Sequence, residues 1–395
     1  MANALLIYSS YCLRDVKGFD FVNHLDDERG LTGSEYGLIR VAQELRDMGH
    51  SVTIATFGSL PPDWESIRLI HYADRHRSEY DWAVSWNEAG SLRSVQAEAK
   101  GCSLQINTVV GPQQGCEDPH GAADLWFCPS GSHHVRLAGS SPGRWEVVPD
   151  GVDPHLYPTG AAARALKVPG RVSWTSSPDR GLHWLLSVWP RVRQAVPWAS
   201  LRVFYSIDKW LKHFDNDELA KHPEPSIIEQ YNRAKYIERV MPLLAGQGVE
   251  VVGGVSRRRL VQEVSETECV AYSCDTVLWS EGFSCSLMEA CAASACPVST
   301  QVDAFPEVYG GVIPLAGMPL GANLDEFAGY VIRALTDAPW RDEVNERATA
   351  HAEKHTWKRM AETKARLLAE VQDGKRAFVS PVREIVLEGD ARVQA

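Results

Sequence analysis

Short apolar segments alternate with longer amphipathic ones along nearly all of this 395-residue chain, and this rhythm constrains the fold more than any other feature. A short apolar run predicts a strand, and apolar residues at helical spacing predict a helix. In the first half we expect strands at residues 5–9, 52–56, 82–86, 103–106, 126–129 and 145–148, and in the second half at 171–175, 201–205, 249–252, 269–272, 297–300 and 312–314. Strands that alternate with helices pair in parallel, so each half predicts a sheet with helices on both faces.

A segment rich in proline and glycine separates the two halves. Residues 149–160 contain three prolines and two glycines, a density typical of a linker. We therefore predict a doubly wound, Rossmann-like domain over residues 1–155 and a second one after it. The carboxyl ends of parallel strands are where such sheets bind ligands, so the two domains are expected to face each other across a binding cleft.

Two helical segments have clear boundaries in the sequence. We expect Ser34 to cap the first helix and Gly49 to end it. Its apolar stripe consists of Leu38, Val41, Leu45 and Met48. Residues 207–241 are polar and too long for a plain connection, so they predict a helical insertion with a helix over 225–240.

Composition excludes several classes of protein. The formal net charge of −11 argues against general affinity for nucleic acid or anionic membranes. The nine cysteines lack C-x-x-C pairs, which favours reduced thiols in the cytoplasm over disulfides or a structural zinc. No segment approaches the roughly 18 consecutive apolar residues of a membrane span, and we expect no secretion signal, because a strand-like run follows Met1 within a few residues. The cluster Arg257-Arg258-Arg259 is interpreted as a solvated loop or helix start.

The chemistry is concentrated in residues 279–290, W-S-E-G-F-S-C-S-L-M-E-A. Glu281 falls in a glycine-containing turn, and Glu289, eight positions later, falls near the start of an apolar helix. The N-terminus of a helix suits an anion such as phosphate, because its N–H groups are free and its dipole end is positive. A carboxylate beside it suits sugar hydroxyls. The segment therefore predicts a pocket for a ligand that carries both phosphate and hydroxyls.

The same segment resembles the E-x7-E motif of retaining GT-B glycosyltransferases, especially glycosyltransferase family 4. Four further segments resemble that family in the same order along the chain: residues 30–35, 147–153, 176–182 and 253–255. Thr356-Trp357 resembles the start of the family's terminal helix, which crosses back to the first domain. The resemblance implies a GT-B fold with an acceptor domain over 1–155, a donor domain over 156–355, and the crossing helix and tail over 356–395.

The resemblance also implies a role for each matching residue. Arg180 and Glu281 are the candidate catalytic residues, with Arg180 at the donor diphosphate and Glu281 at hydroxyls of the transferred sugar. Glu289 would accept hydrogen bonds from both ribose hydroxyls. The other candidate donor-binding residues are Gly33 and Gly181 near the diphosphate, Val255 beside the nucleobase, and Gly282, Phe283 and Ser284, whose N–H groups would face the sugar and β-phosphate.

The chain also departs from the family pattern. An early basic residue near the diphosphate is replaced by Ser176 or Ser177. The family's histidine near the transferred sugar has no clear counterpart, which leaves Asn107 and His120 as weak candidates on the acceptor side.

The implied reaction transfers a sugar from a nucleotide diphosphosugar to an acceptor hydroxyl with retention of configuration. Front-face attack is favoured over a covalent adduct with Glu281. With no D-x-D site visible, we expect no essential metal and no cofactor besides the donor substrate. A small-molecule or glycan acceptor is favoured. The alternatives are a modified nucleobase or polymer acceptor, a phosphorylase, hydrolase or epimerase of the same fold, and a catalytically weak glycan-binding or scaffold protein. The donor base, the sugar, the acceptor, its activating base and the oligomeric state stay open.

Overall fold

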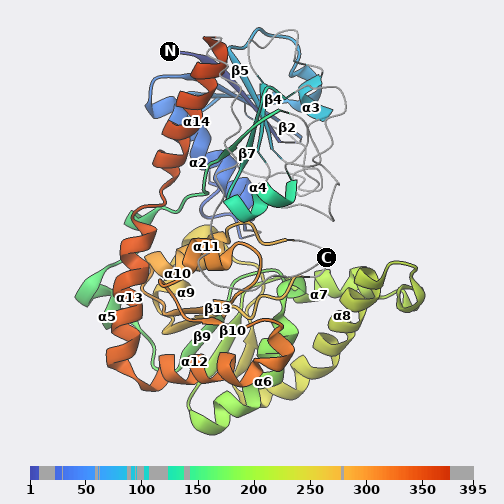
Figure 1. The fold of residues 1–395 in the computed structure, drawn as a ribbon, viewed down its shortest axis with the longest axis vertical. Coiled ribbons are helices and arrows are strands. Elements are labelled where there is room, and N and C mark those ends of the chain that lie inside the picture. The colour runs from blue at the N-terminus through green and yellow to red at the C-terminus, as the bar shows by residue number, and fades with distance from the viewer. Residues whose placement is uncertain are drawn as a thin grey trace.

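The computed structural model describes residues 1–8, 23–28, 30–57, 61, 63–86, 90–93, 95, 102–105, 123–137, 143–276 and 280–373. Two sheets divide the molecule into an upper half, built on the first sheet, and a lower half, built on the second (Figure 1). The helices of the upper half (Figure 1) are α2 (Gly33–Asp47), α3 (Gly90–Arg93), α4 (Gly131–Leu137) and, from the end of the chain, α14 (Trp357–Gln372). The other helices are α5 (Gly160–Leu166), α6 (Leu182–Ala195), α7 (Ile207–Leu211), α8 (Pro225–Leu244), α9 (Arg257–Ser265), α10 (Cys285–Ala292), α11 (Phe305–Tyr309), α12 (Leu324–Thr336) and α13 (Ala338–Ala352).

The first sheet has the strand order β3-β4-β2-β1-β5-β6-β7-β8. Its strands are β1 (Asn3–Tyr8), β2 (Ser51–Thr56), β3 (Asp63–Trp64), β4 (Ile67–His71), β5 (Trp82–Trp86), β6 (Cys102–Gln105), β7 (Leu125–Cys128) and β8 (Arg144–Val147). Only β3 and β4 pair antiparallel among these strands. All six expected strands are present. The β3–β4 pair was not expected, because β3 has two residues and Arg68 interrupts the apolar run of β4.

Strand β1 is buried on both faces. Leu6 and Tyr8 lie in a core cluster with residues of α2 and α14. Leu5 and Ile7, which point to the opposite face, lie in a cluster with Leu92 of α3. Successive side chains of a strand alternate between faces, so a run that is apolar on both faces places β1 at the centre of a sheet covered on two sides.

The first helix, α2, begins earlier than its expected cap. Thr32, rather than Ser34, is the N-cap, and Glu35 completes a capping box in which the Thr32 N–H donates to the Glu35 carboxylate at 2.8 Å. A threonine three residues before a glutamate satisfies two helix-end N–H groups reciprocally, which a cap at Ser34 would not. The apolar stripe was predicted correctly: Leu38, Val41 and Leu45 are buried.

The second sheet is entirely parallel in the order β11-β10-β9-β12-β13-β14. Its strands are β9 (Arg171–Trp174), β10 (Ser200–Val203), β11 (Val249–Val251), β12 (Cys269–Ala271), β13 (Pro297–Thr300) and β14 (Leu315–Ala316). The last strand was expected at 312–314 and lies later, because the Val312 N–H donates to the Tyr309 carbonyl at 2.9 Å and closes a turn after α11.

The chain returns from the lower half to the upper one at α14. Helix α13 belongs to the lower half, and α14 packs on α2 in the upper half (Figure 1). The return lies beside the linker, where the Val152 N–H donates to the His355 carbonyl at 2.9 Å. The two halves are therefore connected by two adjacent crossing segments.

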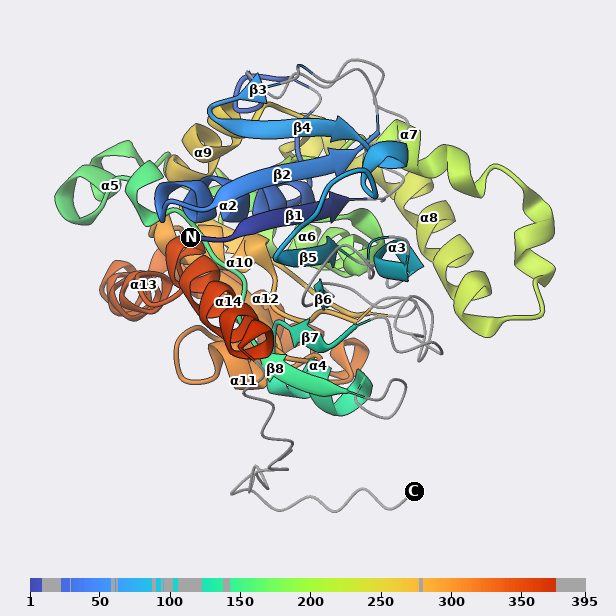
Figure 2. The ribbon, with the colours of Figure 1, turned by 90° about the horizontal axis from the view of Figure 1, so that it is seen from above.

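The expected helical insertion is present as α7 and α8. Figure 2 shows α8 projecting from the side of the molecule opposite α5. Arg233 anchors α8 to the lower half, donating to the Asp275 carbonyl at 2.7 Å and to its carboxylate at 3.0 Å. Among helices in the described ranges, none has the length and apolarity that crossing a bilayer requires.

Candidate functional site

The E-x7-E segment forms a bend followed by a helix. Residues 280–284 lead from β12 towards α10, and Ser284 caps that helix by accepting from the Leu287 N–H at 3.3 Å. Glu281 lies in the bend and Glu289 in the helix, as expected. The Phe283 side chain packs in the core near Tyr309.

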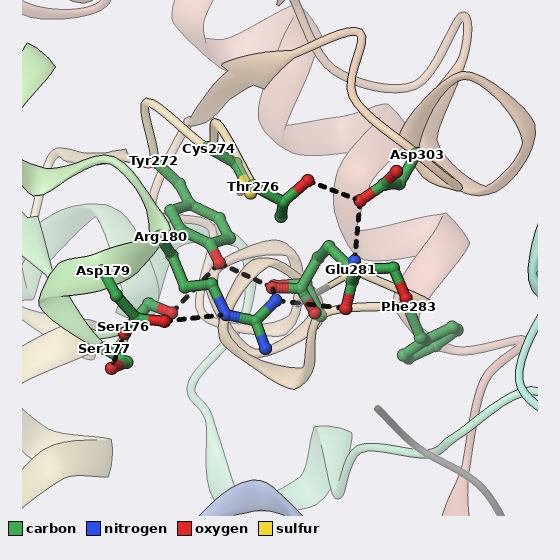
Figure 3. Close-up of polar contacts among 12 residues, drawn as sticks. Ser176, Ser177, Asp179, Arg180, Tyr272, Cys274, Thr276, Glu281, Phe283 and Asp303 are labelled. Atoms are coloured by element: carbon green, nitrogen blue, oxygen red, sulfur yellow. Dashed lines mark hydrogen bonds and ion pairs between the residues drawn. The ribbon is translucent and has the colours of Figure 1, made fainter. Parts of the chain in front are cut away.

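A buried cation and carboxylate meet at the centre of this site (Figure 3). Arg180 follows β9, and its Nη1 lies 3.2 Å from Glu281 Oε2 and 3.2 Å from the Ser280 carbonyl. The Tyr272 hydroxyl donates to the same Glu281 oxygen at 2.6 Å. Burial acts to lower the pKa of Arg180, but the adjacent Glu281 carboxylate raises it above its ordinary value. Arg180 is therefore a permanent positive charge with a fork of donors.

Gly181 makes this position of Arg180 attainable. Its φ is 109°, and a Cβ there would lie 2.0 Å from the Ser273 carbonyl oxygen. Only glycine fits both the left-handed backbone and this close approach. The turn after β9 therefore packs closely against the loop after β12, and this contact places Arg180 next to Glu281.

Asp303 hydrogen-bonds to the backbone of the bend at Glu281 and to residues on either side of it. Its Oδ2 accepts from the Glu281 N–H at 2.8 Å and from the Thr276 hydroxyl at 2.8 Å (Figure 3). Its Oδ1 accepts from Arg136 of α4 at 3.0 Å. Arg136 belongs to the upper half, so this carboxylate ties the backbone of Glu281 to both halves of the molecule. The sequence carries no local signal for this contact, which joins residues 167 positions apart.

A small cavity of about 110 Å³ lies between α4 and the bend. Ser132, His133 and Arg136 line it from the upper half, and residues 280, 281, 303 and 304 line it from the lower half. His133 Nε2 lies 3.1 Å from the Ser280 hydroxyl, and a Cβ on Gly282 would lie 2.8 Å from its Nδ1. We did not anticipate His133 from the sequence. Its one signal is the polar S-G-S-H-H run directly after β7.

Acid should weaken the contact between the halves through His133. Burial foremost, aided by Arg136, lowers the pKa of His133 from 6.5 to about 4. Between those values the unfolded chain binds a proton that the folded chain does not, so the free energy of unfolding falls as the pH falls from 6.5 to 4. For this one group the loss is roughly 3 kcal/mol. Buried His183 and half-buried His355, whose pKa values burial lowers to about 3 and about 4, act in the same direction.

Urea unfolding from pH 7.5 to 4.5 measures this slope. His133→Gln retains a partner for Ser280 but cannot titrate, so its slope should be shallower than that of the unmodified protein. His134→Gln, at the next position and only partly buried, is the matched control for replacing a histidine by glutamine. Equal slopes in all three proteins would contradict the prediction.

The second carboxylate of the motif is also paired. Glu289 Oε1 lies 2.5 Å from Arg257 Nη1, and both side chains are buried. The guanidinium of Arg257 stacks 4.3 Å above the Tyr36 ring of α2. The arginine cluster is a helix start, as one of the two interpretations had it, because Arg257 is the first residue of α9. Solvation holds for Arg258 and Arg259, which are exposed, and is wrong for Arg257, which is buried against Glu289 of α10.

The glycine segment of the upper half contacts the residues that follow β11 and begin α10. A Cβ on Gly30 would lie 2.7 Å from the Val255 carbonyl oxygen, and one on Gly33 would lie 3.3 Å from Cys285 Sγ. Gly33 and Val255 are thus brought to the same interface as the bend and α10. Asn107 and His120 lie outside the described residues.

Ser176 and Ser177 stand on the turn after β9. The Ser176 hydroxyl donates to Tyr272 at 3.0 Å, and Ser177 hydrogen-bonds to Asp179. Through Tyr272, Ser176 contacts the cluster that contains Glu281. The described residues contain no group of three or more metal-ligating side chains.

No protein-family model matches the chain, and no curated protein matches its sequence. Solved structures do match. Sucrose-phosphate synthase from Thermosynechococcus elongatus is 14% identical, with 94% of this chain and 100% of that one covered and a TM-score of 0.67. Anabaena HepE, solved in complex with UDP and glucose, is 13% identical, with 93% and 99% covered and a TM-score of 0.64. AviGT4, a glycosyltransferase involved in avilamycin A biosynthesis, is 16% identical, with 94% and 98% covered and a TM-score of 0.61.

These likenesses span both halves of each protein. The fold expected from the sequence is confirmed: the chain has the GT-B fold, with two Rossmann-like sheets facing each other.

Proposed function

We propose that the chain is a glycosyltransferase that moves a sugar from a nucleotide diphosphosugar to an acceptor hydroxyl with retention of configuration. The observation that carries the proposal is the position of the Arg180–Glu281 pair. Arg180 follows β9 and Glu281 follows β12, and these strands are neighbours at the point where the strand order of the second sheet reverses. Open α/β sheets bind their ligands at this switch point.

The residues of the site suit such a donor. Arg180 offers a forked, permanently charged donor set to the diphosphate, whose negative charge grows as the sugar leaves. Glu281, held in place by Tyr272 and Asp303, is an acceptor for sugar hydroxyls. Glu289 is the acceptor for ribose hydroxyls, and Gly33, Gly181, Val255 and residues 282–284 line the donor. Charge stabilisation by Arg180 and the N-terminal end of α10 is the main catalytic contribution that we propose.

Several further features belong to the proposal. Attack occurs on the front face, with the leaving phosphate helping to take the acceptor proton, and no essential metal takes part. The acceptor domain spans residues 1–155, the donor domain 156–355, and the crossing segment 356–395. A small molecule or glycan is the acceptor. We place the protein in the cytoplasm, in keeping with six described cysteines that are free thiols.

Thermal unfolding with UDP, GDP, ADP, CDP, dTDP and NAD tests the donor class. A ligand present at about 100 times its Kd stabilises the fold by roughly 2.7 kcal/mol, which raises the Tm by several degrees. One nucleoside diphosphate should produce this shift, and its sugar conjugates should then be consumed with an acceptor. The proposal fails if none of the diphosphates binds or if NAD alone binds.

Glu289→Gln should weaken binding of that diphosphate at least about tenfold, because an amide replaces a charged acceptor at the ribose. The variant keeps the shape of the side chain and can still accept from Arg257. Glu343→Gln, an exposed position on α13, removes the same charge away from the site and should bind normally. Isothermal titration calorimetry measures the Kd of the diphosphate for the unmodified protein and for each of the two variants.

A further inference from the structure

The buried guanidinium of Arg257 is only partly satisfied. Its Nη1 pairs with Glu289, but Nε and Nη2 have no acceptor within the part of the chain that the structure describes. Both atoms are buried, and the side chain is 6% exposed. A buried, charged N–H group without an acceptor is costly, so native proteins rarely leave two on one side chain unless a ligand, an ion or a bound water supplies the oxygens.

The surroundings restrict what can supply those oxygens. The Tyr36 ring covers a face of the guanidinium at 4.3 Å, so the free N–H groups point outwards in the guanidinium plane. Glu289 lies in contact with the same guanidinium and only accepts hydrogen bonds. A ligand that contacts both side chains from beside the pair must therefore donate to Glu289 and accept from the free N–H groups of Arg257. Vicinal hydroxyl groups do both, because each oxygen is at once a donor and an acceptor.

The pair also lies at the boundary between the two halves. Tyr36 belongs to α2 of the upper half, and Val255, two residues before Arg257, lies under Gly30. A ligand bound at the pair would therefore lie between the halves, a position from which other two-domain sites exclude water by closing.

Resting on the proposed function, we propose that Arg257 is a specificity-determining residue that, with Glu289, binds the 2′,3′-diol of the donor ribose. Glu289 accepts from the hydroxyl groups, and the free N–H groups of Arg257 donate to the same oxygens. The paired charges thereby distinguish a ribonucleotide from its deoxy counterpart, because a missing hydroxyl leaves buried groups of the protein unpaired.

The test measures the affinities of UDP, GDP, ADP and CDP, each beside its 2′-deoxy counterpart. The unmodified protein should prefer the ribonucleotide of its base by about 10- to 100-fold, as expected for one hydrogen bond to a charged group. Arg257→Lys keeps a cation next to Glu289 but removes the forked N–H groups. It should bind the ribonucleotide about tenfold more weakly and reduce the preference to a few-fold. Arg258→Lys and Arg259→Lys, the exposed neighbours, should behave as the unmodified protein.

The preference ratio separates this role from a structural one, because a general loosening of the fold weakens both ligands equally. Arg257→Met, compared at the same two ligands, provides a second variant that lacks the charge. The inference is overturned if Arg257→Lys and Arg257→Met keep the full preference, or if the unmodified protein binds ribo- and deoxynucleotides equally. Failure to bind any nucleoside diphosphate, dTDP included, refutes the proposed function itself, whereas binding of dTDP alone, or binding without discrimination, refutes only the role of Arg257.

Discussion

Arg180→Ala is expected to lower kcat about 100- to 1,000-fold, because it removes the positive charge that we propose stabilises the leaving diphosphate. The substitution should also destabilise the fold. Arg180 and Glu281 have side chains 11% and 12% exposed, and removing one partner of a buried ion pair costs about 3–5 kcal/mol. Product formation under saturating donor measures the first effect, and urea unfolding measures the second.

Two further variants separate activity from stability. Arg180→Met with Glu281→Gln removes both charges, so most of the lost stability should return while turnover stays low. Arg180→Lys keeps the positive charge without the forked N–H groups, so its turnover should lie between that of the alanine variant and that of the unmodified protein. Arg191→Ala, at a half-exposed position on α6, is the control for loss of an arginine. Normal turnover by Arg180→Ala would show that this site does not carry the chemistry.

Trp357→Ala is expected to cost about 3–5 kcal/mol of unfolding free energy, which is the usual loss for a large aromatic side chain removed from a core. Trp357 is 2% exposed, its ring lies edge-on to Tyr36 at 6.1 Å, and a Cβ on Gly37 would lie 3.0 Å from it. It begins α14, the segment that returns to the upper half. Loss of this contact should therefore loosen the upper half first.

Urea unfolding gives the total cost, and amide hydrogen exchange shows where it falls. Exchange should accelerate in α2 and α14 more than in the second sheet. Trp198→Ala is the matched control, because this tryptophan is 60% exposed and its loss should change stability by less than about 0.5 kcal/mol. A cost of that small size at Trp357 would mean that α14 does not hold the upper half together.

The elements that were predicted correctly owe their structure to neighbours along the chain. The strand at Trp82–Trp86 is apolar except for Ser85 and buried throughout, and the stripe of α2 repeats at helical spacing, so each pattern is complete within a few residues. The cap of α2 and the β3–β4 pair, which were not predicted correctly, also depend on nearby residues, but on smaller differences between them. Thr32 and Ser34 are both plausible caps, and only the pairing of Thr32 with Glu35 decides between them. The β3–β4 pair is too short for its alternation to stand out.

The candidate site likewise combines a local pattern that the sequence predicts with contacts between distant residues that it does not predict. The Glu281 bend and the start of α10 form a local pattern of turn, cap and apolar helix. The partners of these residues come from far away in the sequence: Arg180 is 101 positions before Glu281, and His133 is 147 positions before Ser280. Such contacts depend on how strands order within a sheet and how the two halves dock, which periodicity does not encode.

The difference between local sequence pattern and tertiary structure is clearest in the arginine cluster Arg257-Arg258-Arg259. The sequence by itself determined the rhythm of two α/β halves, the linker between them and the E-x7-E turn, because these follow from apolar periodicity and turn chemistry within short windows. Only the tertiary structure decided which of three identical side chains enters the site. Successive residues of a helix point about 100° apart, so one arginine meets Glu289 and Tyr36 while the next two remain in solvent.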